Sequence, residues 1–344
     1  MKVLYLRESI PWFGGHSGYE QLPRYLAGAH QLRTVTPRAG LFARYLGSTW
    51  GRLLGRPGRG ATDMGELEFR LQRSWWRPQI SHLLYLDYHL DLLAAWPKTP
   101  KGLVGTVHLP PSVWKPDQFR LLSHLNSAIV LYQRDLPFFE NLVGKGNVRF
   151  VHLGTDIEFF KPDKAKQAAA PRILYSGVYL RNEAMLVRVV ERLTKSFSHL
   201  RFDLLVPQHH RGVPALTALR EHPAITWHGG LNDDQLRDLY QKSHLMLLPM
   251  NDSGANTSVV EALASGLPVV TTDVGGIRDY GGASIFPVVD NNQDDAMVSL
   301  VEKYLSSPVW REQVAQGCRA FAETHLAWPV VAERHINIYK QFIA

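Results

Sequence analysis

Short apolar runs recur along the chain, each followed by a polar junction and a segment with helical spacing. Each run has three to five residues and is bounded by glycine, proline or polar residues, as expected for strands buried on both faces of a parallel sheet. The pattern predicts a parallel α/β fold. The expected strands are residues 2–6, 82–86, 103–107, 128–131 and 148–151, and then 172–176, 202–206, 225–227, 245–248 and 267–270.

The clearest unit lies between residues 245 and 280. Residues 245–248 are apolar and end at Pro249, and after a polar loop Thr257 and Ser258 stand directly before an apolar helical run. Hydroxyl residues in that place are a common N-cap signal, and Gly266 marks the end of the helix. The loop therefore follows the carboxyl end of a parallel strand, where open α/β sheets bind ligands.

The start of this helix has a chemistry that suits phosphate. The first N–H groups of a helix, here those of Asn256, Thr257 and Ser258, lack helical partners, and the helix dipole favours an anion there. Glu261 lies one turn further on and can reach the same loop. The pattern fits an ordinary capped helix with a surface glutamate equally well, so both interpretations stay open on pattern alone.

Composition sets the general class. With 344 residues the chain is long enough for two domains, and 45% hydrophobic and 20% charged residues are ordinary for a globular protein. A single cysteine, Cys318, excludes an internal disulfide and fits a reducing compartment. No apolar run approaches the roughly 20 residues that a membrane span needs, and the chain starts in a strand rather than a signal peptide. We therefore expect a cytoplasmic protein, and its net charge of +7 suggests an anionic partner.

Residues 38–77 are strongly basic. They contain eight arginines and three acids, interleaved with leucines and aromatic residues. Such a segment can lie on an anionic membrane, which would make the protein peripheral at the inner face of the membrane. A helix packed on its domain with a solvated basic face is an equal alternative. Nucleic acid is not expected as a partner, because no known RNA- or DNA-binding module is visible.

The segment VVEALASGLPVVTTDVGG, residues 259–276, resembles the nucleotide-sugar signature of the retaining glycosyltransferases of family 4. That resemblance implies the GT-B fold: two Rossmann-like domains facing across a cleft, with a C-terminal helix crossing back to the N-terminal domain. VRFVHLGTDIEFFKP (148–162) is similar to the segment that closes the first domain, and LAWP (326–329) to the start of the final helix. The expected domains are 1–160 with 328–344, for the acceptor, and 171–327, for the nucleotide sugar.

The resemblance also implies roles for individual residues. Glu261 would bind the ribose hydroxyls, and the loop before it would hold the diphosphate and the sugar. Glycines of the first loop would approach the diphosphate, and the turn after the strand at 225–227 would lie beside the base. The implied donor-binding residues are Gly14, Gly15, Gly177, Gly230, Leu231, Asp252, Ser253, Asn256, Thr257, Ser258 and Glu261.

Two catalytic residues follow from the same resemblance. His108, at the end of GTVH, would face the transferred sugar; a strand-end histidine bonded to the backbone is the alternative. Arg181 is the only cation in the loop after Gly177, and would neutralise the diphosphate. His16 would lie on the acceptor side, unless it is simply an exposed loop histidine.

The sequence departs from the family at three positions. Val178 and Glu183 occupy the places of a usual arginine and lysine, and Ser253 occupies that of a usual glutamate, with Asp252 beside it as a candidate substitute. These changes bear on the choice of donor and on turnover.

We expect a retaining hexosyltransferase that moves a sugar from a nucleoside-diphosphate donor to a glycan, lipid-linked or small-molecule acceptor. No cofactor and no metal are implied, because no Asp-x-Asp or similar carboxylate pair occurs in a matching loop. A nucleotide-sugar epimerase of the same fold and a non-catalytic nucleotide-sugar-binding subunit are the alternatives.

Overall fold

The computed structural model describes residues 1–8, 10, 14–28, 30–37, 40–53, 55, 58–94 and 100–343. The chain forms two compact units. Unit 1 contains Met1–Pro11, Tyr19–Val151 and Pro329–Ala344, and unit 2 contains Trp12–Gly18 and His152–Trp328. The described part of the loop after the first strand, residues 14–18, thus belongs to unit 2.

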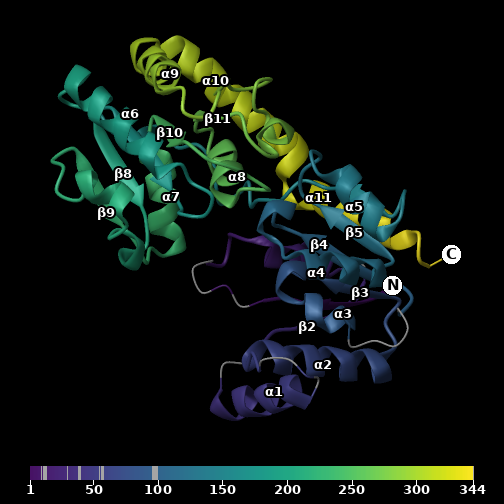
Figure 1. The fold of residues 1–344 in the computed structure, drawn as a ribbon. Helices are drawn as coiled ribbons and strands as arrows, with labels where there is room; N and C mark the ends of the chain where they lie inside the picture. Colours follow the sequence, from purple (N-terminus) through teal and green to yellow (C-terminus); the bar gives the residue numbers. More distant parts are fainter. Residues whose placement is uncertain are drawn as a thin grey trace. The chain divides into compact units, whose positions relative to one another are not determined.

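Unit 1 is built on a sheet of six parallel strands (Figure 1). The sheet has the order β2-β1-β3-β4-β5-β6. The chain therefore moves outward from β1 to β2 and then continues on the other side of β1, so that the order reverses between β1 and β3. The strands are β1 (Lys2–Leu6), β2 (Gln31–Val35), β3 (Ile80–Leu83), β4 (Leu103–Val107), β5 (Ser127–Val130) and β6 (Val148–Phe150).

Helices flank this sheet. They are α1 (Leu41–Leu53), α2 (Ala61–Trp76), α3 (Leu90–Ala94), α4 (Pro116–Phe119), α5 (Leu136–Val143) and, from Pro329 on, α11 (Trp328–Lys340). Of these, α2 and α5 pack directly on its strands. The core cluster contains residues from β1, β3, β4 and β5 together with Phe69 of α2 and Phe139 of α5. Residues Tyr19–Tyr25, which follow the first loop, form a 3-10 helix, and Pro23 inside it cannot donate a helical hydrogen bond.

A chain of buried hydrogen bonds holds α11 in unit 1. Tyr339 bonds to Nδ1 of His82 at 2.6 Å and to the hydroxyl of Tyr5 at 3.4 Å, and His335 bonds to the hydroxyl of Tyr19 at 2.5 Å. These five side chains are almost completely buried. Because an unpaired polar group in such a place is costly, the network fixes how α11 lies on β1 and β3.

Unit 2 is built on a second sheet of six parallel strands, in the order β12-β11-β10-β7-β8-β9. Counted within the unit this is 3-2-1-4-5-6, the strand order of dinucleotide-binding Rossmann sheets, with its reversal between β7 and β10. The strands are β7 (Arg172–Ser176), β8 (Arg201–Leu205), β9 (Ile225–His228), β10 (Leu245–Leu248), β11 (Val269–Thr272) and β12 (Val288–Val289).

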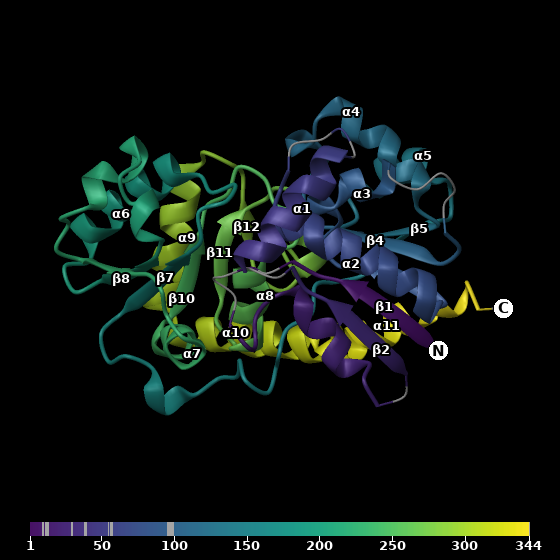
Figure 2. The ribbon, with the colours of Figure 1, turned by 90° about the horizontal axis from the view of Figure 1, so that it is seen from below.

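The helices of unit 2 are α6 (Glu183–Ser196), α7 (Asp233–Lys242), α8 (Thr257–Ala264), α9 (Asp294–Ser306) and α10 (Pro308–Phe321), followed by a π-helical turn at Ala322–Leu326. Figure 2 shows α10 and α11 as the successive yellow helices of the chain's end. Asparagine side chains cap three helices, with Asn182 before α6, Asn232 before α7 and Asn256 before α8. The expected capping of α8 by Thr257 or Ser258 is therefore wrong: both lie inside its first turn.

The predicted α/β fold with two parallel sheets is confirmed. The strands at 2–6, 103–107, 172–176 and 245–248 have the predicted bounds, and the other six are shifted by one to three residues at an end. β2 and β12 were not expected: β2 is largely polar and partly exposed, and β12 has only two residues.

Candidate functional site

Two loops meet at the carboxyl ends of β7 and β10, where the strand order of unit 2 reverses. The N–H of Asn182 donates to the carbonyl of Pro249 at 2.9 Å, and the N–H of Asn251 donates to the carbonyl of Leu180 at 2.9 Å. Arg181 and Met250 form an antiparallel bridge between the same loops. The loops thus form one platform at the position where sheets of this order bind ligands.

Arg181 lies on this platform without an acidic partner. Its Nε and Nη2 donate to the carbonyl of Ser176 at 3.1 and 3.0 Å, Nη1 donates to the carbonyl of Tyr179 at 3.0 Å, and Nη2 lies 3.4 Å from Oδ1 of Asn256. Burial lowers the pKa of Arg181. Within the described ranges no carboxylate pairs with it. A desolvated cation surrounded by neutral groups is suited to an incoming anion.

Gly177 allows the guanidinium to take this place. Its φ is +86°, and a Cβ there would lie 2.8 Å from Nη2 of Arg181. Any other residue would therefore strain the backbone and push the guanidinium away. This gives a physical reason for the glycine at the end of β7.

The start of α8 adds main-chain donors to the platform. Asn256 caps the helix, with its Oδ1 accepting from the N–H of Val259. The N–H groups of Thr257 and Ser258 have no hydrogen-bond partner in the part of the chain that the structure describes. Ser258 Oγ donates to Ser176 Oγ at 3.0 Å, which ties α8 to the end of β7. Free amides, a helix N-terminus and the Arg181 cation thus lie together, as a phosphate group requires.

Glu261 lies one turn into α8 and is 3% exposed. Its Oε1 accepts from Ser17 Oγ at 2.5 Å and its Oε2 accepts from the hydroxyl of Tyr240 at 2.8 Å. Burial raises the pKa of Glu261 to about 7, while the hydrogen bonds from Ser17 and Tyr240 act to lower it. The carboxylate is thus held by two hydroxyl donors, the same kind of group that a ribose presents. Neither Ser17 nor Tyr240 was predicted from the sequence.

The loop that contains Gly14 and Gly15 contacts Asp233 at the start of α7. The N–H of Gly15 donates to Oδ2 of Asp233 at 2.7 Å, and Gly14 packs so closely on the same carboxylate that a Cβ would collide with it. Asp233 also acts to raise the pKa of Glu261. The loop amide that was predicted to approach a diphosphate is therefore bound here to a carboxylate, an anion from the chain itself.

His16 follows in the same loop. Its Nδ1 is 2.7 Å from Oδ2 of Asp156, and its ring stacks on Phe159 at 3.7 Å between centroids. Asp156 and Phe159 were part of the recognised 148–162 segment but had no assigned role. The contacts fix the imidazole within unit 2; its acceptor-side role stays a prediction.

Gly230 and Leu231 form the turn between β9 and α7. Gly230 is exposed with a φ of +66°, and Leu231 is half-buried directly before the cap residue Asn232. The left-handed backbone explains the glycine. The predicted contact with a base stays a prediction.

Asp252 and Ser253 lie in the loop after β10. Ser253 is 4% exposed, its Oγ donates to the carbonyl of Gly254 at 3.0 Å, and its carbonyl accepts from the N–H of Gly276 at 2.8 Å. Oδ1 of Asp252 accepts from the N–H of Ser253 at 2.8 Å. Ser253 therefore fastens this loop to the turn after β11, and the half-buried carboxylate beside it belongs to Asp252.

His108 lies in unit 1, whereas the other predicted site residues lie in unit 2. Its Nε2 is 2.7 Å from the carbonyl of Leu84, and its ring stacks on Tyr85 at 4.5 Å. Because Nε2 must carry the proton in this bond, Nδ1 is the acceptor in the neutral ring. Burial lowers the pKa of His108 to about 4, so the ring is neutral at physiological pH. Asp87 holds the main chain here by accepting from the N–H groups of His108 and Leu109.

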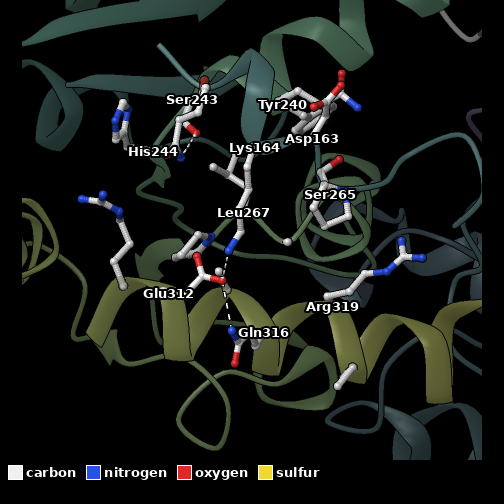
Figure 3. Close-up of a pocket in the computed structure, with 18 of the residues that line it drawn as sticks. Asp163, Lys164, Tyr240, Ser243, His244, Ser265, Leu267, Glu312, Gln316 and Arg319 are labelled. Carbon is white, nitrogen blue, oxygen red and sulfur yellow. Dashed lines mark hydrogen bonds and ion pairs between the residues drawn. The ribbon is translucent and has the colours of Figure 1, made fainter. Parts of the chain in front are cut away.

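A separate cavity of about 350 Å³ lies beside the amino ends of β10 and β11, whereas the platform lies at the carboxyl ends of the strands (Figure 3). It is lined by the segment that enters β11, by α10 and by the 162–167 segment. Lys164 bridges it through an ion pair of 2.6 Å with Glu312, which also bonds to Gln316. None of the predicted donor-binding residues lines this cavity.

The described residues contain no cluster of three or more histidine, cysteine, aspartate or glutamate side chains arranged to hold a metal ion. None of their helices has the length and apolar character needed to cross a bilayer.

Comparison with known structures identifies the fold. A sucrose-phosphate synthase from Thermosynechococcus elongatus superposes with a TM-score of 0.75 at 15% identity, covering 99% of both chains. Anabaena HepE (Alr3699), in a structure with UDP-glucose, superposes with a TM-score of 0.73 at 14% identity, covering 99% of this chain and all of the other. The two parallel sheets with their flanking helices are those of the GT-B glycosyltransferase fold.

Sequence comparison also relates unit 2 to glycosyltransferases. Residues 170–307 match the family model described as Glycosyl transferases group 1. D-inositol 3-phosphate glycosyltransferase of Xylanimonas cellulosilytica is 26% identical over 225 residues, which are 56% of this chain and 51% of that protein. The chain spans about half or less of the length of the curated relatives it matches. The matched family region contains Gly177, Arg181 and the whole of α8.

Proposed function

We propose that the protein is a glycosyltransferase that binds a nucleoside-diphosphate sugar on the platform of unit 2. The observation that carries this proposal is the grouping of Arg181, the free amides at the start of α8 and the buried Glu261. The first two suit a diphosphate and the third suits a ribose. The family match of residues 170–307 supports the same activity, and UDP-glucose in the HepE structure is consistent with a donor of this class.

Charge stabilisation is the main catalytic task in this proposal. A nucleoside diphosphate is already a good leaving group, so the transition state needs chiefly a partner for the negative charge that develops on it. Arg181 supplies a fixed cation, and Thr257 and Ser258 supply N–H donors at the positive end of a helix dipole. Such a site works without a metal ion, and no other cofactor is included in the proposal.

The proposed transfer retains the anomeric configuration of the donor sugar. The acceptor would attack the face that the diphosphate leaves, and the departing phosphate oxygen would take the acceptor's proton. His108, neutral and bonded through Nε2 to a backbone carbonyl, would act at the transferred sugar, and His16 on the acceptor side. The acceptor would be a glycan, a lipid-linked molecule or a small molecule, with residues 38–77 as a peripheral membrane contact.

Incubation with UDP-, GDP- and dTDP-sugars tests this function, with nucleotide release and sugar products followed with and without acceptors. Acceptor-dependent release with an α-linked product from an α-linked donor is expected. A 2-epimer formed without acceptor would instead identify an epimerase. Binding without turnover with every acceptor would identify a non-catalytic subunit. The reason to test for one is that a buried serine, Ser253, stands where the family usually has a glutamate.

A further inference from the structure

Helix α1 carries its large apolar side chains on the side exposed to solvent. Leu41 is 86% exposed, Phe42 and Leu53 are each 76% exposed and Tyr45 is 71% exposed. At 100° per residue these positions fall on one side of the helix, together with Leu46 and Thr49. We call Leu41, Phe42, Tyr45, Leu46, Thr49 and Leu53 the α1 face. A helix on the surface of a globular protein normally buries such a face.

The opposite side of α1 is made of glycine and packs on α2. Gly47 and Gly51 are buried. A Cβ at Gly47 would collide with the carbonyl of Gly60, and one at Gly51 would lie 2.5 Å from the Asp63 carboxylate. Figures 1 and 2 show α1 running beside α2, which itself packs on β1 and β2. Turning the α1 face inward would place leucine and aromatic side chains where only glycine fits, so its exposure is built into the packing.

The charges around the α1 face are positive. Arg44 and Arg52 are exposed, and α1 contains no acid. In the rest of the segment Asp63 and Glu66 are completely buried, and both form ion pairs with Arg59. Two of the three acids of residues 38–77 are therefore withdrawn from the surface. What remains outside is an apolar surface bordered by arginines.

We propose that the α1 face inserts into the interfacial region of an anionic membrane, with Arg44 and Arg52 on lipid phosphates. A helix of 13 residues is too short to span a bilayer but suited to lie in its surface. A second copy of the chain fits less well: pairing two α1 faces about a two-fold axis would bring the arginines of both copies together, with no acid on either helix to pair with them. The proposal is independent of the reaction at unit 2.

Co-sedimentation with vesicles tests the proposal. The full chain should bind vesicles of phosphatidylcholine and phosphatidylglycerol, and bind those of phosphatidylcholine alone several-fold less. Phe42→Ser should lower binding about tenfold, because it removes a large side chain from the interface. Val309→Ser is the matched control: Val309 is also 72% exposed but lies on α10, and its change should have no effect.

The arginines give a second, independent comparison. Arg44→Gln and Arg52→Gln should each lower binding about fivefold, and the loss should shrink as salt screens the surface charge. Lys195→Gln, an exposed cation on α6, should have no effect. Equal binding by wild type and Phe42→Ser, or binding that does not depend on lipid charge, would overturn the proposal.

A labelled cysteine reports the position of the helix. Cys318 is buried, so a fluorophore attached through Thr49→Cys would label the centre of the α1 face selectively. Its emission should shift to the blue on anionic vesicles, whereas the same label at Ser196→Cys of α6 should not shift. A concentration-dependent dimer that Phe42→Ser abolishes, with no shift on vesicles, would assign the α1 face to a second copy and refute membrane insertion.

Discussion

The hydroxyl of Ser17 donates to Oε1 of Glu261 at 2.5 Å, joining residues 244 positions apart in the sequence. The hydroxyl of Tyr240 donates to the other carboxylate oxygen, Oε2. Both oxygens are thus held by groups that a ribose diol would replace or join. The carboxylate is positioned before any ligand arrives, which reduces the cost of ordering it on binding.

Glu261→Gln should weaken nucleotide binding. Glutamine fills the same space but accepts at one oxygen only and carries no charge, and hydrogen bonds to a charged group contribute about 1.5–3 kcal/mol. We expect UDP or GDP affinity to fall about 10- to 100-fold by isothermal titration calorimetry. Glu191→Gln, an exposed glutamate on α6, serves as the control and should bind as wild type does. Wild-type affinity in Glu261→Gln would refute the ribose assignment.

Nucleotide affinity should depend on pH through the same residue. Burial raises the pKa of Glu261 to about 7, and a ribose hydroxyl donates better to the ionised form, so affinity should rise as pH rises through about 7. Asp233→Asn should move this midpoint to lower pH, since Asp233 acts to raise the pKa. Titrations between about pH 5.5 and about pH 8.5 measure both, and a flat profile in wild type would contradict the role of Glu261.

The stability of the fold should respond to pH in the opposite sense. A carboxyl whose pKa is higher in the folded state than the ordinary 4.5 keeps its proton on folding, so the free energy of unfolding falls as pH rises from about 4.5 to about 7. Glu261→Gln removes this contribution, which is on the order of 3 kcal/mol. Urea unfolding of both proteins at several pH values measures the difference; parallel pH curves would show that the carboxyl is not perturbed.

Gly177→Ala should impair turnover while keeping every charge of the site. The new Cβ would lie 2.8 Å from Nη2 of Arg181, at a backbone φ of +86°, so the guanidinium must move. We expect a fall in kcat of about 100-fold, comparable with Arg181→Lys, because a misplaced donor no longer stabilises the leaving group. Gly212→Ala is the control, since its nearest neighbour is 3.8 Å away. Normal kcat in Gly177→Ala with a folded protein would argue against Arg181 as the diphosphate partner.

His108→Ala should lower kcat more than it lowers donor binding, if the ring acts at the transferred sugar. Burial lowers the pKa of His108 to about 4, so titration of this ring should not change the wild-type rate near pH 6.5. The pH profiles of wild type and His108→Ala should therefore have the same shape in that range. His209→Ala, an exposed histidine of unit 2, is the control. Equal losses in kcat and in donor affinity would assign His108 a purely structural role.

Ser253→Glu tests the departure from the family pattern. The serine is buried and its main chain is held by Gly276, so a glutamate would overpack the loop and lower the free energy of unfolding by about 1–3 kcal/mol. Asp252→Asn should leave stability within about 0.5 kcal/mol and lower turnover, if Asp252 replaces the missing carboxylate. Thermal melts and donor turnover of the two variants separate these roles. A stable Ser253→Glu protein with higher turnover would contradict the packing argument.

The sequence predicts the buried strands well and the contacts around the site poorly. The runs at 172–176 and 245–248 become strands with those bounds because both faces of each are covered. The strand expected at 82–86 ends three residues earlier, at Leu83, because the apolar side chains continue past β3 as far as the 3-10 helix at Leu86–Tyr88. β2 was missed because its polar, exposed side chains lack the apolar signal.

The site shows the same limit. Glu261 was noted from its place one turn into a helix that follows a strand end, whereas Gly177 and Arg181 were chosen through the family resemblance. Ser17, Tyr240, Asp156 and Asp233 could not be predicted, since their roles come from tertiary contacts and their own segments carry no distinguishing pattern. Asn256 was expected as an anion-binding amide, but its side chain also caps α8.

A crystal structure with UDP, GDP or a hexose conjugate of either tests most directly whether the platform of unit 2 binds the donor. We predict that the ribose lies against Glu261 and that the diphosphate lies between Arg181 and the N–H groups of Thr257 and Ser258. Density for the nucleotide elsewhere, with Glu261 still bonded to Ser17 and Tyr240 and the platform empty, would contradict it.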